Sequence, residues 1–346
     1  MSRFRARAAL FLLALTVGCA GTLAPAVASA TTAPARSQAA SGWLARQMVR
    51  GSHFVTVYSG VSYPAQGETI DALLAFAATK SANGYGARAI AWLERPSVLS
   101  NYIGSGTESY AGATAKTALA AEVRGINPAR FGKVNLISRL ANLLTKSGRY
   151  SDHSVYGDYS NAFSQSLAII ALSRHGGAPA KAVSFLISSE CKNGGFPLDF
   201  GQKTCVSDTD STAMDVQALL AAGGQRAAAV RGLTWLKRVQ RPAGGLDAAG
   251  KKVPNANTTG LAGEAFAAGR WYRNAALAAK FLRSLQVGCS AKPWKRGAIA
   301  YDSTGFAESS AVDATAQGIL GLADVSLASI SARGSRNGDP RLECAS

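Results

Sequence analysis

The feature that most constrains this fold is a string of residues that recurs along the chain. DTDSTAMDVQALLAAG, at residues 208–223, is echoed by NANTTGLAGEAFAAG at residues 255–269, a shift of 47 positions. The same step backwards reaches Asn161, where another polar start leads into an Ala/Leu-rich stretch. Looser copies begin at Gly67, Gly112 and Glu308. A fixed period of this size indicates one supersecondary unit that is copied and stacked, each copy burying the apolar face of the next.

Each copy contains two patterns that predict helices. The first is the recurrent string itself, which is small and apolar on nearly every face and is therefore typical of a helix buried on all sides. The second pattern is amphipathic, with apolar residues three and four positions apart and Lys or Arg between them. It occurs at residues 89–93, 136–144, 182–187, 232–239 and 279–285. Glycine-rich stops follow, as at residues 193–196 and 243–246.

These patterns predict an all-α fold built of two concentric layers. The Ala-rich helices form an inner ring, and the amphipathic helices form an outer ring around it. Small side chains allow the inner helices to approach one another closely. About six such pairs are enough for the array to close on itself, although periodicity alone does not establish closure.

Parts of these strings resemble a known family. Residues 185–196 (FLISSECKNGGF) and 235–246 (WLKRVQRPAGGL) resemble the prenyltransferase/squalene-cyclase repeat, in which an aromatic-Leu pair and a Gln precede Gly-Gly-aromatic. The string DTDSTA at residues 208–213 is similar to the DxDD-Thr-Ala motif of class II terpene cyclases. The resemblance covers residues 42–325 and implies an α/α toroid, similar to exported bacterial members of that superfamily. A shared fold does not fix the function.

The acid motif implied by the resemblance is degenerate. Class II cyclases protonate an alkene, which requires a carboxylic acid held protonated by its neighbours. The resemblance places Asp210 at the proton donor, beside Asp208, but Ser211 replaces the last carboxylate. The matching copy carries Asn255 and Asn257, which are not acids, and the inner strings offer few aromatic residues to stabilise a cation. A terpenoid cyclase-like enzyme acting through Asp208 and Asp210 is therefore the alternative hypothesis, and a non-catalytic protein the preferred one.

The same positions suit a structural role. Asp208 and Asp210 stand at the start of a predicted helix, where side-chain oxygens cap free N–H groups and complement the helix dipole. Polar residues occupy this place in other copies as well, and a ring of capped helices would gather them around one mouth of the toroid. The candidate ligand-binding residues are accordingly Asn161, Asp208, Asp210, Asn255, Asn257 and Glu308, with Tyr159 and Tyr301 nearby.

No metal or other cofactor is predicted. A resemblance to protein prenyltransferases would imply a zinc site built from Asp, Cys and His. The chain has three histidines, His53, His153 and His175, and none has the spacing of a metal ligand relative to another.

The N-terminus reads as a secretory signal peptide at residues 1–30. Three arginines precede the apolar run at residues 8–17, and an Ala-Ser-Ala sequence ending at Ala30 provides a cleavage site. Residues 31–41, rich in Ala, Thr, Pro and Ser, predict a disordered lead-in. Residues 42–346 then form a single toroid domain, and the mature protein is predicted to be secreted into the extracellular medium.

Removal of the signal peptide leaves four cysteines: Cys191, Cys205, Cys289 and Cys344. An even number in an exported chain indicates two disulfides, for which four cysteines allow three pairings. The preferred pairing joins Cys191 to Cys205, across a glycine-rich loop, and Cys289 to Cys344, which ties the tail to the last unit.

The charge points to anionic partners. The formal charge is +17, and removal of the three signal-peptide arginines leaves +14. A basic exported protein is attracted to anionic cell-envelope polymers, whereas no nucleic-acid motif accompanies the charge. The sequence predicts a monomer without a transmembrane segment. Three hypotheses remain: a protein that binds a small apolar or planar ligand, a degenerate cyclase, and a scaffold for protein contacts.

Overall fold

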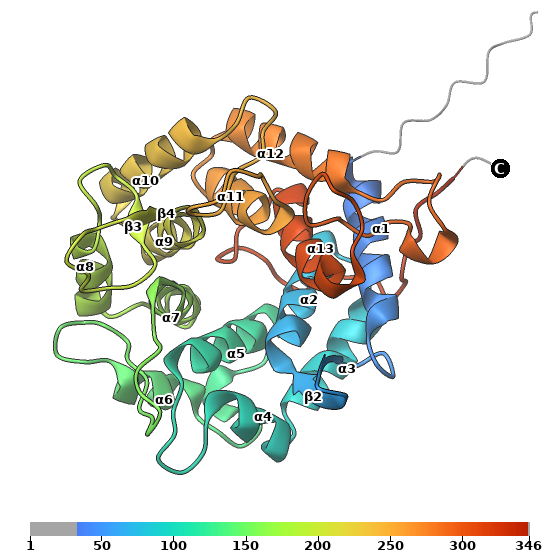
Figure 1. Ribbon diagram of the computed structural model, residues 1–346. Coiled ribbons are helices and arrows are strands. Elements are labelled where there is room, and N and C mark those ends of the chain that lie inside the picture. Colours follow the sequence, from blue (N-terminus) through green and yellow to red (C-terminus); the bar gives the residue numbers. More distant parts are fainter. Residues whose placement is uncertain (1–32, 345–346) are drawn as a thin grey trace, which may run out of the picture. The chain divides into compact units, whose positions relative to one another are not determined.

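The computed structural model describes residues 33–344, and its architecture is a ring of helices in two layers (Figure 1). Each of the six sequence copies begins at or beside the start of an inner helix, as the repeat predicts. The inner helices are α2 (Gln66–Thr79), α5 (Ala111–Arg124), α7 (Ala162–Arg174), α9 (Thr209–Ala222), α11 (Ala256–Ala268) and α13 (Glu308–Leu322). Each inner helix packs against the next, and α13 packs against α2, so that the ring closes. The α/α toroid is confirmed.

The outer layer carries the amphipathic helices. They are α1 (Ala33–Gln47), α3 (Asn83–Leu93), α6 (Leu136–Leu143), α8 (Ala180–Ser188), α10 (Arg226–Val239) and α12 (Tyr272–Leu285). In α10, for example, Leu233 and Leu236 are buried, whereas Lys237 and Arg238 are exposed. An additional short helix, α4 (Pro96–Ile103), and two 3₁₀ turns, η1 (Pro128–Arg130) and η2 (Pro293–Lys295), lie in connections. No helix among residues 33–344 has the length and apolarity that crossing a bilayer requires.

The predicted lead-in at residues 31–41 is wrong from Ala33 onward, because these residues form the first part of α1. Alanines favour helix formation, and Ala39, Ala40, Trp43 and Leu44 are buried. Helix α1 packs against α13 and α2 and is the sixth outer helix. It lies near the N-terminal end of the described residues, whereas α13 lies near their C-terminal end. The predicted signal peptide lies outside the described residues.

Short strands occur at the entrances to two inner helices. Strands β1 (Phe54–Tyr58) and β2 (Val61–Ala65) form an antiparallel hairpin before α2, with Phe54 opposite Ala65. Strands β3 (Phe196–Pro197) and β4 (Ser207–Asp208) pair before α9.

A side-chain oxygen in the inner helix fixes the loop that leads into it. In α9, the Thr212 hydroxyl accepts a hydrogen bond from Phe196 N at 2.8 Å. In α11, the Thr259 hydroxyl accepts one from Leu246 N at 2.9 Å. Thr69, Gln165 and Thr315 do the same for Phe54, Tyr150 and Ile299. The donors are all buried aromatic or aliphatic residues. The residue that follows Gly-Gly in the sequence signature therefore supplies the backbone donor of the hydrogen bond between the loop and the inner helix.

Helices α11 and α13 meet through glycine. A Cβ built on Gly260 would lie 2.4 Å from Gln317 O, and one on Gly321 would lie 2.9 Å from Gly260 Cα. Neither position has room for a side chain. The small residues of the recurrent string thus permit the close helix approach that the sequence predicts.

The segment after α13 crosses the C-terminal ends of inner helices. Leu327 N donates to Gln217 Oε1 at 3.0 Å, and Arg174 donates to the carbonyl oxygens of Leu327, Ala328 and Ile330. Farther along, Ala332 N bonds to a carbonyl of α5. The chain continues past α1 to Cys344. The segment therefore lies beneath the centre of the ring.

Both predicted disulfides are present. Cys191 is bonded to Cys205, with Cα atoms 5.5 Å apart, and Cys289 to Cys344, with Cα atoms 5.6 Å apart. The first closes the loop that carries β3 and β4, and the second attaches the C-terminal segment beside α12. Disulfides of this kind are typical of extracellular or periplasmic proteins.

Candidate functional site

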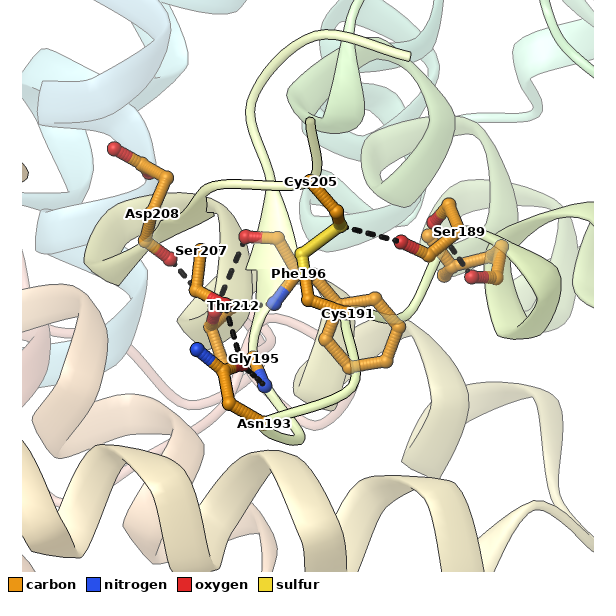
Figure 2. The surroundings of a disulfide bond; sticks show 10 residues. Ser189, Cys191, Asn193, Gly195, Phe196, Cys205, Ser207, Asp208 and Thr212 are labelled. Atoms are coloured by element: carbon orange, nitrogen blue, oxygen red, sulfur yellow. Dashed lines mark hydrogen bonds between the residues drawn. A yellow bond between two sulfur atoms is a disulfide. The ribbon is translucent and has the colours of Figure 1, made fainter. Parts of the chain in front are cut away.

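Asp208 is the N-cap of α9. Its Oδ1 accepts a hydrogen bond from Ser211 N at 2.7 Å. The β3–β4 pairing and the Cys191–Cys205 disulfide hold the preceding loop, as Figure 2 shows. One oxygen of this carboxylate is thus engaged in capping, as the structural interpretation of the motif predicts.

Two of the predicted asparagines have the same role. Asn161 Oδ1 accepts from Phe163 N and Ser164 N, and the Ser164 hydroxyl accepts in return from Asn161 N, which completes a capping box. Asn255 Oδ1 accepts from Thr258 N at 2.9 Å, and the Asn255 side chain is buried. The capping prediction is confirmed for Asn161, Asp208 and Asn255.

Glu308 does not cap its helix. The N-cap of α13 is Ala307, and Glu308 is the exposed first residue of the helix. It lines a groove of about 390 Å³ beside strand β1, together with Glu68 and Asp313. Burial, followed by the nearby Glu68 and Asp71 carboxylates, raises the pKa of Asp313.

Asp210 differs from Asp208 in its environment. It lies in the first turn of α9, largely buried, and its Oδ1 has no hydrogen-bond partner. Burial raises the pKa of Asp210 to about 6, and the neighbouring Asp208 charge adds to this, while the Thr258 hydroxyl works against it. This carboxyl therefore holds its proton to a higher pH than an ordinary aspartate does.

The remaining predicted residues do not converge on one site. Asn257 is half-buried, with Oδ1 unpaired. Tyr159 is 76% exposed and Tyr301 is 37% exposed, and neither ring lines a cavity described below. A groove of about 510 Å³ runs between the disulfide loop and Ala249, and Asp208 is the predicted residue that reaches it.

A second space lies on the axis of the ring. It has a volume of about 170 Å³, and every inner helix contributes to its lining, with Leu327 of the C-terminal segment beneath. The apolar part of the lining comprises Leu74, Phe163, Leu167, Met214, Leu261, Leu320 and Leu327. The polar part comprises Asp71, Lys116, Glu264 and Gln317.

Two of these polar residues neutralise each other. Lys116 Nζ lies 2.7 Å from Asp71 Oδ1, and both side chains are about four-fifths buried, with 20% and 21% exposed. Burial acts to lower the pKa of Lys116, but the Asp71 and Tyr102 groups outweigh burial, and the pKa is raised. Lys116 is therefore a permanent cation at the rim of the cavity.

Glu264 on α11 has no such partner. It is 0% exposed, and neither carboxyl oxygen makes a hydrogen bond. Burial raises the pKa of Glu264 well above its ordinary value, and the Gln217 side chain on α9 only partly offsets this. Asp215 of α9 is also fully buried; its Oδ1 is bonded to the Ser166 hydroxyl of α7, and its Oδ2 has no partner.

These interior polar groups are not among the residues predicted from the sequence, although the repeat contains a signal for them. Glu264 and Gln217 occupy the same place in two copies, 47 positions apart. A charged residue in the middle of an otherwise small and apolar string is expensive to bury unless it is paired. It therefore marks a position worth examining.

The histidines occupy separate places. His53 stacks on Trp92, with ring centroids 4.4 Å apart, and His175 Nδ1 lies 2.7 Å from Glu122 Oε1 on the exposed side of α5. His153 is exposed in the loop before α7. In the part of the chain that the structure describes, no three His, Cys, Asp or Glu side chains are grouped so as to hold a metal ion.

Comparison with known proteins shows similarity of fold alone. No protein family and no curated protein matches the sequence. An α-1,6-mannanase of Salegentibacter, solved with α-1,6-mannotriose, matches with a TM-score of 0.62 and 10% identity, over 85% of this chain and 98% of the other. An unsaturated glucuronyl hydrolase of Bacillus matches with a TM-score of 0.58 and 11% identity, over 84% and 96%.

A terpene cyclase is similar too. The ent-copalyl diphosphate synthase of Streptomyces platensis matches with a TM-score of 0.51 and 16% identity, over 76% of this chain and 51% of the synthase. Glycosidases and terpene cyclases thus share this architecture. The chain is an α/α toroid, of the fold that serves both groups.

Proposed function

We propose that this chain is an exported toroid that binds a compact ligand in its axial cavity and catalyses no reaction. The observation that carries the proposal is the cavity of about 170 Å³ to which all six inner helices contribute. Most of its lining is apolar, and a ligand that covers apolar surface gains about 25 cal/mol for each Å² removed from water.

The size of the space selects among ligands. An apolar cavity of about 150 Å³ accepts benzene, whereas pockets for drug-sized ligands begin near 300 Å³. A compact ring or short branched chain therefore fits, and a polyprenyl chain does not. The engagement of Asp208 in capping also supports a binding role over acid catalysis.

Native mass spectrometry of the mature protein, purified from its secretion medium, tests the proposal. We expect a small molecule that is present on the folded protein and released on denaturation. Leu320→Phe, which enlarges a side chain in the cavity lining, should reduce the bound fraction. An apo mass that persists after exposure to benzene-sized compounds, with no shift in melting temperature, would contradict the binding role.

A second candidate, acid-dependent cyclisation, rests on Asp210. Its buried position, its unpaired Oδ1 and its pKa of about 6 are features of a general acid. However, Asp210 is not part of the axial lining. Incubation with a polyprenyl diphosphate should give no product. A cyclised isomer of the diphosphate whose formation Asp210→Asn abolished would instead support an enzyme.

Export and envelope contact belong to the same proposal. We infer that the signal peptide is removed after Ala30 and that the protein is released as a monomer with a charge of +14. Basic side chains of the α10–α12 sector, including Lys237, Arg238 and Arg273, would attract anionic polymers. The mannanase and the glucuronyl hydrolase act on carbohydrate chains, which is compatible with such polymers as partners. Retention on an anionic polymer that falls steeply with salt would support this contact.

A further inference from the structure

The axial cavity contains an acid without a counter-ion. Glu264 lines the cavity, is fully buried, and has two carboxyl oxygens that make no hydrogen bond. The side chain of Gln217 is close enough to offset part of the effect of burial on Glu264, but Gln217 Nε2 is not in hydrogen-bonding geometry with either oxygen, and its Oε1 is engaged by Leu327 N. Leaving a buried polar group unsatisfied is unfavourable. A bound donor would relieve this.

The two other charged residues of the lining neutralise each other. Lys116, the cation among the described lining residues, is paired with Asp71 across 2.7 Å. Asp215 on α9 lies outside this lining, with Oδ1 bonded to the Ser166 hydroxyl and Oδ2 unpaired. Among the described residues that line the cavity, none therefore presents an unpaired cation to Glu264, and the lining cannot hold an anion without breaking the Lys116–Asp71 pair.

The remainder of the lining is apolar. Leu261 and Met214 lie one turn before Glu264 and Gln217 on their helices, and Leu74, Leu320 and Leu327 complete the walls. Such a surface takes the hydrocarbon part of a ligand, and the single free carboxyl takes its polar end. Ligand sites commonly combine an apolar wall with a few placed polar groups.

We propose that the axial cavity binds a primary ammonium ion carried on a compact apolar body, with the ammonium donating hydrogen bonds to Glu264. The proposal rests on the binding function proposed above and names the ligand class of that site. An alkyl or aryl amine of benzylamine size matches the volume, since about 150 Å³ accommodates a benzene ring. In a site of low polarity, a charge-assisted hydrogen bond is about twice as strong as a neutral one.

We expect ligand binding to be coupled to the release of a proton from Glu264. Because burial raises the pKa of Glu264, the cavity without ligand favours the neutral form of this carboxyl. An ammonium ligand favours the carboxylate, so the proton of Glu264 leaves to solvent as the ligand enters. Asp71 and Lys116 line the same cavity and are paired with each other. Affinity should accordingly rise with pH, by up to tenfold per unit below the pKa of the empty site.

Calorimetric titration of the mature protein tests the assignment. The probes are benzylamine, benzyl alcohol and toluene, which share one ring, titrated at pH 6 and pH 8 in buffers of different ionisation enthalpy. We expect benzylamine to bind at least tenfold more tightly than toluene at pH 8, with net release of a proton. Glu264→Gln should lose that tenfold advantage and still bind toluene, which shows that the ring is intact.

A matched control is Glu94→Gln, the same change outside the ring at the end of α3, which should behave as the wild type. Toluene binding without an advantage for benzylamine would overturn the ligand class and leave the binding cavity standing. Benzylamine binding that Glu264→Gln does not weaken would overturn the assignment to Glu264. Binding of none of the probes would contradict the cavity function itself.

Discussion

At the scale of single residues, the two aspartates of one motif have different environments. Asp208 caps α9 and is accessible to the groove beside the disulfide loop. Asp210, two residues later, faces inward and keeps an unpaired oxygen. Their positions in the sequence are equivalent to Asn255 and Asn257 of the next copy, where the first caps its helix and the second has an unpaired oxygen. Both copies therefore have a capping residue followed two positions later by an unpaired oxygen, but the side chains are aspartates in one copy and asparagines in the other.

The capping role of Asp208 predicts a stability loss that depends on the replacement. Asp208→Ala removes the acceptor for Ser211 N and should lower the free energy of unfolding by about 0.5–2 kcal/mol. Asp208→Asn retains an acceptor and should be close to the wild type. Urea unfolding of both variants checks this. Equal losses would show that the negative charge, and not the cap, stabilises the helix.

Asp210 predicts a dependence of stability on pH. Its pKa is about 6 in the folded protein and near its ordinary value of 3.8 in the unfolded chain. The folded state therefore binds the proton more tightly, and this contribution is complete below pH 3.8 and is lost as the pH rises through about 6.

Asp210→Asn should remove this dependence. Relative to the wild type, the variant should gain up to about 3 kcal/mol on going from pH 4 to pH 7, because one pKa unit corresponds to about 1.4 kcal/mol. Urea unfolding at pH 4, 5.5 and 7 measures it. Parallel curves for the two proteins would mean that Asp210 titrates normally.

At the scale of elements, each hydrogen bond from a loop N–H to an inner-helix side chain holds that loop against its helix. Thr259→Val leaves Leu246 N buried without its acceptor, which should cost about 1–3 kcal/mol. The matched control is Thr234→Val on the exposed face of α10, where the hydroxyl bonds only within its own helix. Thermal unfolding of the pair separates the two roles. Similar melting temperatures for the two variants would show that the hydrogen bond from Leu246 N to Thr259 contributes little to stability.

The sequence predicts the elements well because the repeat states each one several times. All six inner helices begin where the copies begin, and five outer helices lie where the amphipathic pattern occurs. The sixth outer helix escapes the pattern, since α1 precedes the first copy and its Ala- and Ser-rich start resembles a linker. Its order comes from packing between α13 and α2, which is information from a distant part of the chain.

The candidate site is predicted less well, for a physical reason. Helix caps are local, so Asn161, Asp208 and Asn255 are found from their positions at helix starts. The axial cavity depends on which face of each of the six inner helices points toward the axis. The sequence does not state how each helix is rotated about its own axis. Glu264 on α11 and Lys116 on α5 line one cavity only because these distant helices face the same axis.

At the scale of the whole described chain, the Cys289–Cys344 bond anchors the C-terminal segment. It closes a loop of 55 residues, and such a link typically contributes about 2–4 kcal/mol. Replacing both cysteines by Ser should speed amide exchange in the C-terminal segment, including Ala332. The corresponding change at Cys191 and Cys205 should affect residues 197–206 instead. Hydrogen exchange followed by mass spectrometry distinguishes them, and identical exchange patterns would contradict separate anchoring.

The placement of α1 beside α13 has a consequence for how the protein is made. The ring is sealed by a helix near one end of the chain meeting a helix near the other, and the C-terminal segment passes so close to α1 that a Cβ on Gly42 would lie 1.8 Å from Pro340 O. A nascent chain cannot form this seam before α13 has been synthesised. In the export proposed above, an unfolded polypeptide that passes through a translocation channel would thereby be kept from completing its ring until α13 has emerged.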